Sequence, residues 1–244
     1  MQDSFYRHFL DQNDKVVLFI GGGGKSSLIN RICQDCKSLK KTAIITSLFP
    51  YITPIESNVL IINDPSIIED QIKNEVKNNP ILFLGKEYDK TRINGYSNKE
   101  IKEIIPKIST DHIFIEVDNT RGRSISGYDN VSTSFSYHVD RCINVIGADA
   151  FNKSINSSWI ESKDKYWNYK NILTPINLAS WYKSNTVLEK LTNRSIPFTY
   201  FINKVENIFI ENLAIPLAKS FKMSGIDRVI VGSVFNSSFH MIKD

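Results

Sequence analysis

The 244-residue chain is 41% hydrophobic, enough to bury a substantial core, and an α/β protein of this length often remains a single domain. Its 30 basic and 26 acidic residues leave a net charge of only +4, spread along the chain, so the electrostatics do not indicate a nucleic-acid partner. No apolar run approaches the roughly 18–20 residues of a membrane span. We therefore expect one domain over residues 1–244.

The cysteines and the beginning of the sequence bear on the compartment. Three cysteines cannot all pair within the chain, and no basic segment followed by a long apolar stretch opens the sequence. We expect a reduced, cytoplasmic protein. Cys33 and Cys36 have no second pair or histidine cluster nearby, whereas a zinc site needs about four ligands, so we assign them no metal or redox role.

The first predicted strand, Val16–Ile20, runs into four consecutive glycines, a lysine and two hydroxyl residues. A glycine-rich backbone turns its N–H groups inward, and a following helix adds its N-terminal dipole, which makes an anion site. Lys25 would reach the β- and γ-phosphates of a nucleotide, and the Ser26 hydroxyl would ligate Mg²⁺. The predicted phosphate-binding residues are Gly21, Gly22, Gly23, Gly24, Lys25, Ser26 and Ser27.

The match to the Walker A pattern is partial. The strict pattern has a glycine where this chain has Phe19, so a merely flexible glycine turn is the alternative interpretation. The next elements agree with the nucleotide-binding interpretation. Apolar spacing from Leu28 to Leu39 predicts a helix, and Thr42–Thr46 predicts a buried strand. The Thr46 hydroxyl at its end would position Mg²⁺ or a phosphate, or else cap the next turn.

The middle of the chain alternates strands and helices. We predict strands over Val59–Ile62 and Ile81–Gly85, a helix from Asp64-Pro65 to about Lys77, a loop over Lys86–Asn98, and a helix behind a capping box at Ser97.

A second informative stretch is the predicted strand that begins at His112 and ends in Glu116-Val117-Asp118. A carboxylate at a strand end can hold Mg²⁺, as in a Walker B element. Glu116 and Asp118 are two residues apart and so face the same side of the strand. We expect one of these two carboxylates to ligate Mg²⁺ together with Ser26 and the other to orient the attacking water. The alternative interpretation is a polar strand end with two solvated acids.

Arg121 and Arg123 follow at once. They would clamp phosphates or a second substrate, or else lie on the surface.

The last third continues the alternation. We predict strands over Arg141–Gly147, Phe198–Asn203 and Val229–Ser233, and helices from Thr174-Pro175 to Tyr182, from Asn185 or Thr186 to Leu191, and over Asn207–Phe221, with further helical packing over Trp159–Leu173. Asp149 either lines the cleft or caps a turn.

Asn203, Lys204 and Glu206 resemble the Asn-Lys-x-Asp motif of GTPases, whose carboxylate accepts hydrogen bonds from two N–H donors of guanine. Such paired recognition discriminates because a wrong base leaves buried polar groups unpaired. Glu206 is one methylene longer than the usual aspartate. The three residues are predicted base contacts.

Together these elements predict a three-layer α/β/α fold of the P-loop NTPase type with a mostly parallel sheet. Four segments also carry a family resemblance: Gly21 to Ser26, Thr46-Ser47, Glu116 to Arg123 and Gly147 to Ile155. They look like, in order, motifs of the YqeC-like selenium cofactor biosynthesis proteins. The chain departs from that pattern at Asn119-Thr120, at Ser126, where the family has a basic residue, and over Tyr128–Thr133.

The resemblance implies an accessory protein for the maturation of selenium-dependent molybdenum hydroxylases. We expect Mg²⁺ and ATP or GTP as ligands, hydrolysis through Lys25, Glu116 and Asp118, and a molybdopterin or selenium compound, or the apo-hydroxylase, as partner. Two alternatives remain: a nucleotide-gated chaperone or scaffold with negligible turnover, and a kinase or nucleotidyl transferase whose Arg121 and Arg123 contact the acceptor.

Overall fold

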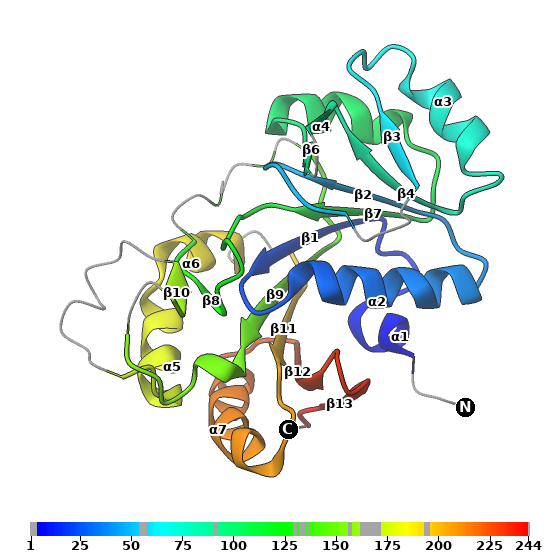
Figure 1. Cartoon of the computed structure of the whole chain (residues 1–244). Helices are drawn as coiled ribbons and strands as arrows, with labels where there is room; N and C mark the ends of the chain where they lie inside the picture. Colours follow the sequence, from blue (N-terminus) through cyan, green and yellow to red (C-terminus); the bar gives the residue numbers. More distant parts are fainter. Residues whose placement is uncertain are drawn as a thin grey trace. The chain divides into compact units, whose positions relative to one another are not determined.

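A computed structural model describes residues 4–53, 58–89, 92–128, 131, 135, 137–155, 158–161, 172–192 and 196–243. Among these residues, nine strands form a mostly parallel sheet with helices in the connections, which confirms the predicted α/β class (Figure 1). The chain divides into two compact units, one of residues 1–18, 29–117 and 134–140 and the other of residues 19–28, 118–133 and 141–244. The single domain over residues 1–244 stays a prediction. No helix in the described part of the chain has the length and apolar character to cross a membrane.

The first unit contains four strands in parallel, in the order β7 (His112–Glu116), β2 (Ala43–Ser47), β4 (Ile81–Gly85) and β3 (Val59–Ile61). All five residues of β2 are buried, as is typical of a parallel strand covered on both faces. The helices are α1 (Phe5–Phe9), α3 (Ile68–Glu75), α4 (Asn98–Ile104) and most of α2 (Lys25–Ser38), with a 3₁₀ turn at Ile105–Lys107. The predicted capping box of Ser97 and Glu100 is confirmed at the start of α4.

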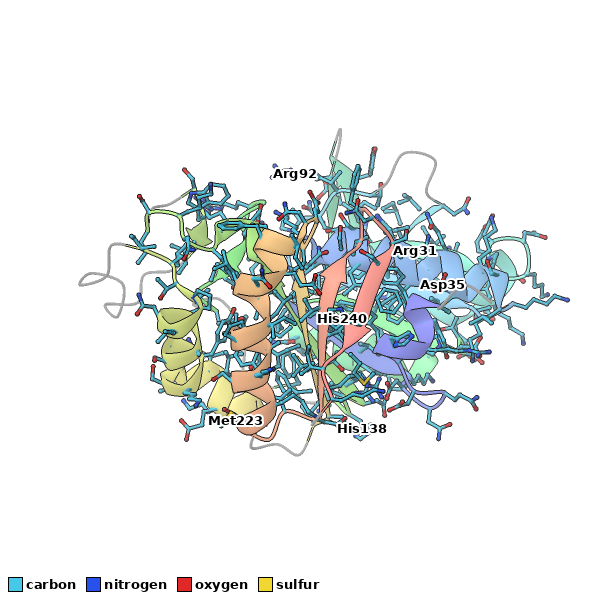
Figure 2. All side chains as sticks on the ribbon, turned by 90° about the horizontal axis from the view of Figure 1, so that it is seen from below. Arg31, Asp35, Arg92, His138, Met223 and His240 are labelled. Atoms are coloured by element: carbon cyan, nitrogen blue, oxygen red, sulfur yellow. The ribbon has the colours of Figure 1, made fainter. Side chains whose placement is uncertain are left out.

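The second unit contains three parallel strands, β9 (Arg141–Gly147), β11 (Phe198–Asn203) and β12 (Arg228–Ser233), with β13 (Ser238–Met241) antiparallel at the edge. A small parallel pair joins β8 (Ile125–Ser126) to β10 (Ile160–Glu161). The helices are α5 (Pro175–Ser184), α6 (Thr186–Thr192) and α7 (Ile208–Met223), with a 3₁₀ turn at Ala148–Ala150. Figure 2 shows His240 on β13 and Met223 at the carboxyl end of α7.

Strand β1 (Val16–Gly21) and helix α2 are each divided between the units: residues 19–28 belong to the second unit, and the remainder of both elements belongs to the first. All six residues of β1 are buried. This burial agrees with its continuous hydrophobic sequence, since parallel strands covered on both faces are hydrophobic throughout. The glycine loop therefore belongs to the second unit.

Several predicted boundaries are wrong. Helix α3 begins at Ile68, because Asp64 accepts the Ser66 N–H and closes a turn instead of capping the helix. The predicted loop over Lys86–Asn98 contains an antiparallel hairpin of β5 (Glu87–Asp89) and β6 (Arg92–Asn94). Leu39 follows the end of α2 and is 41% exposed, so it does not extend the buried helix face.

Two further differences concern the second unit. Strand β13 was not predicted, because Ser238–Met241 is a mostly exposed edge strand without an apolar run. In the segment Trp159–Leu173, predicted to be helical, Ile160–Glu161 is a strand, and residues 162–171 lie outside the described part.

Candidate functional site

The glycine loop is closely packed. An added Cβ at Gly21 would lie 2.1 Å from the Val145 carbonyl oxygen, and one at Gly23 would lie 2.3 Å from the Gly147 nitrogen. Both glycines also have positive φ, 93° and 71° respectively. No other residue fits so near to backbone in that conformation. The loop is therefore a closely packed connection between β1 and α2.

Lys25 and Asp118 are joined at the end of this loop. The Lys25 Nζ lies 3.0 Å from Asp118 Oδ1, in an ion pair without the alignment of a hydrogen bond, and the two side chains are 5% and 4% exposed. Lys25 Nζ also donates to the Gly21 carbonyl oxygen at 2.5 Å. A buried ion pair of this kind depends on additional hydrogen bonds that satisfy each partner. The structure thus brings together two of the predicted site residues, Lys25 for the phosphates and Asp118 for Mg²⁺ or water.

The Asp118 carboxylate has two more partners through its other oxygen. Oδ2 accepts the Gly21 N–H at 3.0 Å and the Ser126 hydroxyl at 2.7 Å. Ser126 is 3% exposed and was not among the predicted residues. A serine eight positions beyond the acid has no local pattern that would have indicated it.

The segment with the predicted phosphate-clamping arginines lies against the glycine loop through its backbone. The Gly23 N–H donates to the Arg123 carbonyl oxygen at 2.9 Å. Arg121 is exposed and has a φ of 51°, and the next residue, Gly122, has a φ of 80°. The arginine segment therefore contacts the predicted phosphate loop, although the contact shown is made by a peptide group and not by a guanidinium.

Asn203 clamps the glycine loop to the end of β12. Its Nδ2 donates to the Gly23 carbonyl oxygen at 2.7 Å, and its Oδ1 accepts the Val234 N–H at 3.0 Å. Both ends of the carboxamide are used within the protein, and the side chain is buried. In this structure Asn203 positions the loop, and its predicted base contact stays a prediction.

Lys204 lies in a cluster with two other residues. Its Nζ donates to Asp149 Oδ2 at 2.8 Å and to the Ser124 hydroxyl oxygen at 3.1 Å. Ser124 in turn donates to Asp149 Oδ1 at 2.6 Å. Asp149 had been predicted either to line the cleft or to cap a turn, and Ser124 was missed. Glu206, two residues beyond Lys204, is exposed.

The remaining predicted residues fall in different places. Ser26 and Ser27 are exposed in the first turn of α2. Thr46 and Glu116 belong to the first unit, whereas Asp118 begins a segment of the second. Thr46 is 1% exposed, and its hydroxyl has no hydrogen-bond partner among the described residues. The Glu116 carbonyl oxygen accepts the Ser47 hydroxyl at 3.1 Å, and the Glu116 residue is half-buried.

The two cysteines of the Cys-x-x-Cys pair are buried in α2. Burial raises the pKa of Cys33 well above its ordinary value and raises the pKa of Cys36 to about 12. Both thiols are therefore protonated at neutral pH. The thiolate is the form that attacks electrophiles and ligates metals.

Fold and site together define an α/β protein with a closely packed glycine loop between strand and helix and a buried lysine–aspartate pair at its end. The model of the YqeC protein family matches residues 17–164, more than half of the chain, and the chain belongs to that family. None of the curated proteins compared with the chain matches it. The family match includes the glycine loop, Asp118 and Ser124, and ends before the Asn203–Glu206 segment.

Proposed function

We propose that this YqeC-family protein binds a nucleotide with Mg²⁺ at the glycine loop and hydrolyses it as an accessory factor in the maturation of selenium-dependent molybdenum hydroxylases. The observation that carries the nucleotide site is the Lys25–Asp118 ion pair of 3.0 Å at the start of α2. A cation and an acid in these positions suit a phosphate loop because phosphate needs positive charge and Mg²⁺ needs carboxylate oxygen.

The residues present fit a Mg-nucleotide. Helix α2 has 14 residues, and its amino end follows the four glycines, so its dipole favours an anion there. Ser26 is exposed in its first turn and would supply a hydroxyl ligand to Mg²⁺, with Asp118 supplying a carboxylate. Mg²⁺, when bound, neutralises charge on the phosphates. Lys25 would turn from Asp118 to the β- and γ-phosphates.

The maturation role rests on family membership and on the motif resemblance. The proposed partners are therefore a molybdopterin or selenium compound, or the apo-hydroxylase. Arg121 and Arg123 are proposed contacts of that second substrate. A thermal-shift comparison of ATP, GTP, CTP and molybdopterin nucleotides, each with Mg²⁺, would identify the ligand, because a ligand that binds only the native state stabilises it according to its affinity.

Calorimetry tests the nucleotide site. We expect Lys25→Ala to weaken Mg-ATP or Mg-GTP binding by at least about 10-fold, because a charge-assisted contact to phosphate is lost. Lys37→Ala is the matched control, since Lys37 is exposed near the other end of the same helix.

Lys25→Ala leaves the Asp118 charge buried without its cation, so Lys25→Met/Asp118→Asn is measured as well to separate binding from folding. Unchanged affinity in both folded variants would contradict the proposed site.

A second candidate function is a nucleotide-gated scaffold with negligible turnover. It is favoured by the hydrogen bond from the Gly23 N–H to the Arg123 carbonyl oxygen, because a loop already engaged by the chain suits a protein whose ligand changes its conformation. Sustained phosphate release by the isolated protein would exclude this candidate. Release at less than about one turnover per bound nucleotide would support it.

A further inference from the structure

We propose that residues 120–126, called here the cover segment, close the glycine loop and must move before phosphate can bind. The inference rests on the proposed function and adds its regulation. In this structure three of the groups that would hold an anion, the Gly21 N–H, the Gly23 N–H and the Lys25 ammonium, already have acceptors from the protein itself.

The first acceptor is a backbone carbonyl of the cover segment. The Arg123 carbonyl oxygen accepts the Gly23 N–H at 2.9 Å, in the middle of the four glycines. The contact is close along the loop, since a Cβ added at Gly22 would lie 2.6 Å from this same oxygen and 2.6 Å from the Ser124 carbonyl carbon. A phosphate oxygen and the Arg123 carbonyl oxygen cannot occupy the same position at the Gly23 N–H.

The second acceptor is the Asp118 carboxylate, which acts as an internal anion. It pairs with Lys25 at 3.0 Å and accepts the Gly21 N–H at 3.0 Å. Ser126, from the cover segment, donates to the same carboxylate at 2.7 Å. Transfer of Lys25 to a phosphate therefore leaves the Asp118 carboxylate without its cation. The hydrogen bond from Ser126 of the cover segment then ends on a buried charge that no cation neutralises.

A latch of three residues holds the middle of the cover segment. The Ser124 hydroxyl donates to Asp149 and accepts from Lys204, and these two form a salt bridge of 2.8 Å. The Ser124 carbonyl oxygen also accepts the Gly147 N–H at 2.8 Å. Asp149 follows β9 and Lys204 follows β11, so the latch attaches the cover segment to the ends of two strands.

The two ends of the cover segment differ in how firmly they are held. Arg121 and Gly122 are in the left-handed region, and no atom lies within 4 Å of the position of a Cβ at Gly122. Beyond the other end, Tyr128 is buried and its hydroxyl donates to Asn144 at 2.8 Å. Packing therefore permits movement at Arg121–Gly122 and opposes it at Tyr128.

Only molecules with an open cover segment can bind phosphate, so the apparent affinity equals the intrinsic affinity multiplied by the open fraction. Weakening the latch should raise that fraction. The Asp149 and Lys204 side chains are about one-third exposed, at 36% and 32%, so solvent screens their attraction and the latch can open without unfolding the unit.

The test uses Ser124→Ala and Asp149→Asn, which weaken the latch and leave the glycine loop, Lys25 and Asp118 intact. Asp227→Asn is the matched control because Asp227 is exposed and remote from the latch in sequence. Hydrogen–deuterium exchange of the free protein reports the Gly23 N–H. Calorimetry with Mg-tripolyphosphate, Mg-ATP and Mg-GTP reports binding without and with a nucleoside.

We expect each latch variant to exchange the Gly23 N–H several-fold faster than wild type and to bind tripolyphosphate about 3- to 10-fold more tightly, with the control unchanged. Binding by the variants alone would support the proposal most strongly. Equal Gly23 N–H exchange rates in the latch variants and wild type would overturn the proposal. If wild type binds tripolyphosphate, faster exchange in the variants without tighter binding would overturn it as well. If neither wild type nor any variant binds the three ligands, the proposed function fails and the gating role fails with it.

Discussion

The Asn203 carboxamide donates to the Gly23 carbonyl oxygen at 2.7 Å and so attaches the end of β11 to a loop 180 residues earlier in the chain. The same side chain accepts the Val234 N–H beyond β12. The glycine loop is therefore positioned by one buried polar residue as well as by its own backbone.

Asn203→Ala should destabilise the protein by about 1–3 kcal/mol, because it leaves the Gly23 carbonyl and the Val234 N–H without their partner. Urea unfolding measures the loss. Asn236→Ala, at an exposed position in the turn after β12, is the control and should change stability by less than about 0.5 kcal/mol. Equal effects of the two substitutions would show that the clamp does not stabilise the loop.

Gly21→Ala should lower the free energy of unfolding more than Gly225→Ala does, although both glycines have positive φ, 93° and 84°. At Gly225 no atom lies within 4 Å of an added Cβ, so only the backbone conformation is penalised, by about 1–2 kcal/mol. At Gly21 the new Cβ would also meet the Val145 carbonyl oxygen at 2.1 Å and force the strands apart. Matching unfolding midpoints for the two variants would contradict the close packing of the loop.

Glu206→Gln should reduce affinity for Mg-GTP by about 10-fold or more and leave Mg-ATP nearly unchanged, if the exposed Glu206 carboxylate accepts the two N–H donors of guanine. Competition calorimetry with both nucleotides gives the ratio directly. Glu189→Gln, exposed on α6, serves as the control. An unchanged ratio would remove Glu206 from the base site without affecting the phosphate site.

Stability should fall as pH drops below about 6.5 because of His112. Burial lowers the pKa of this side chain below its ordinary value of 6.5, and its ring nitrogens contact the Asp14 carbonyl oxygen at 2.6 Å and the Tyr6 hydroxyl at 3.0 Å. Below pH 6.5 the unfolded chain takes up a proton that the folded chain does not, so the free energy of unfolding declines by up to about 1.4 kcal/mol per pH unit until the folded pKa is reached.

Urea unfolding between pH 5 and 8 measures this slope. A His112→Gln variant should lose the His112 contribution to it, whereas His8→Gln should retain that contribution. A slope that is the same in all three proteins would assign the pH dependence to other groups.

Native protein should react slowly with a thiol reagent at pH 8. All three cysteines are buried, and burial raises the pKa of each thiol. Denaturation should expose three fast-reacting thiols per chain. Rapid labelling of the native protein would show that α2, which carries Cys33 and Cys36, opens readily.

Local sequence patterns predicted most elements and the positions of the loop residues. Apolar runs placed β1, β7, β9 and β11, because parallel strands buried on both faces need continuous hydrophobic segments. The hairpin within Lys86–Asn98 and the edge strand β13 were not predicted, since short exposed strands carry little periodicity.

The sequence by itself determined the fold class, the glycine loop between β1 and α2, and the acidic end of the strand that precedes Asp118. Only the tertiary structure decided that Asp118 pairs with Lys25 across 93 positions, that Asn203 clamps Gly23, and that Ser124 meets Asp149 and Lys204. The physical reason is that each contact joins residues at or beyond the ends of different strands. Strand order sets which loops meet, and the residues of any one loop contain no signal of that order.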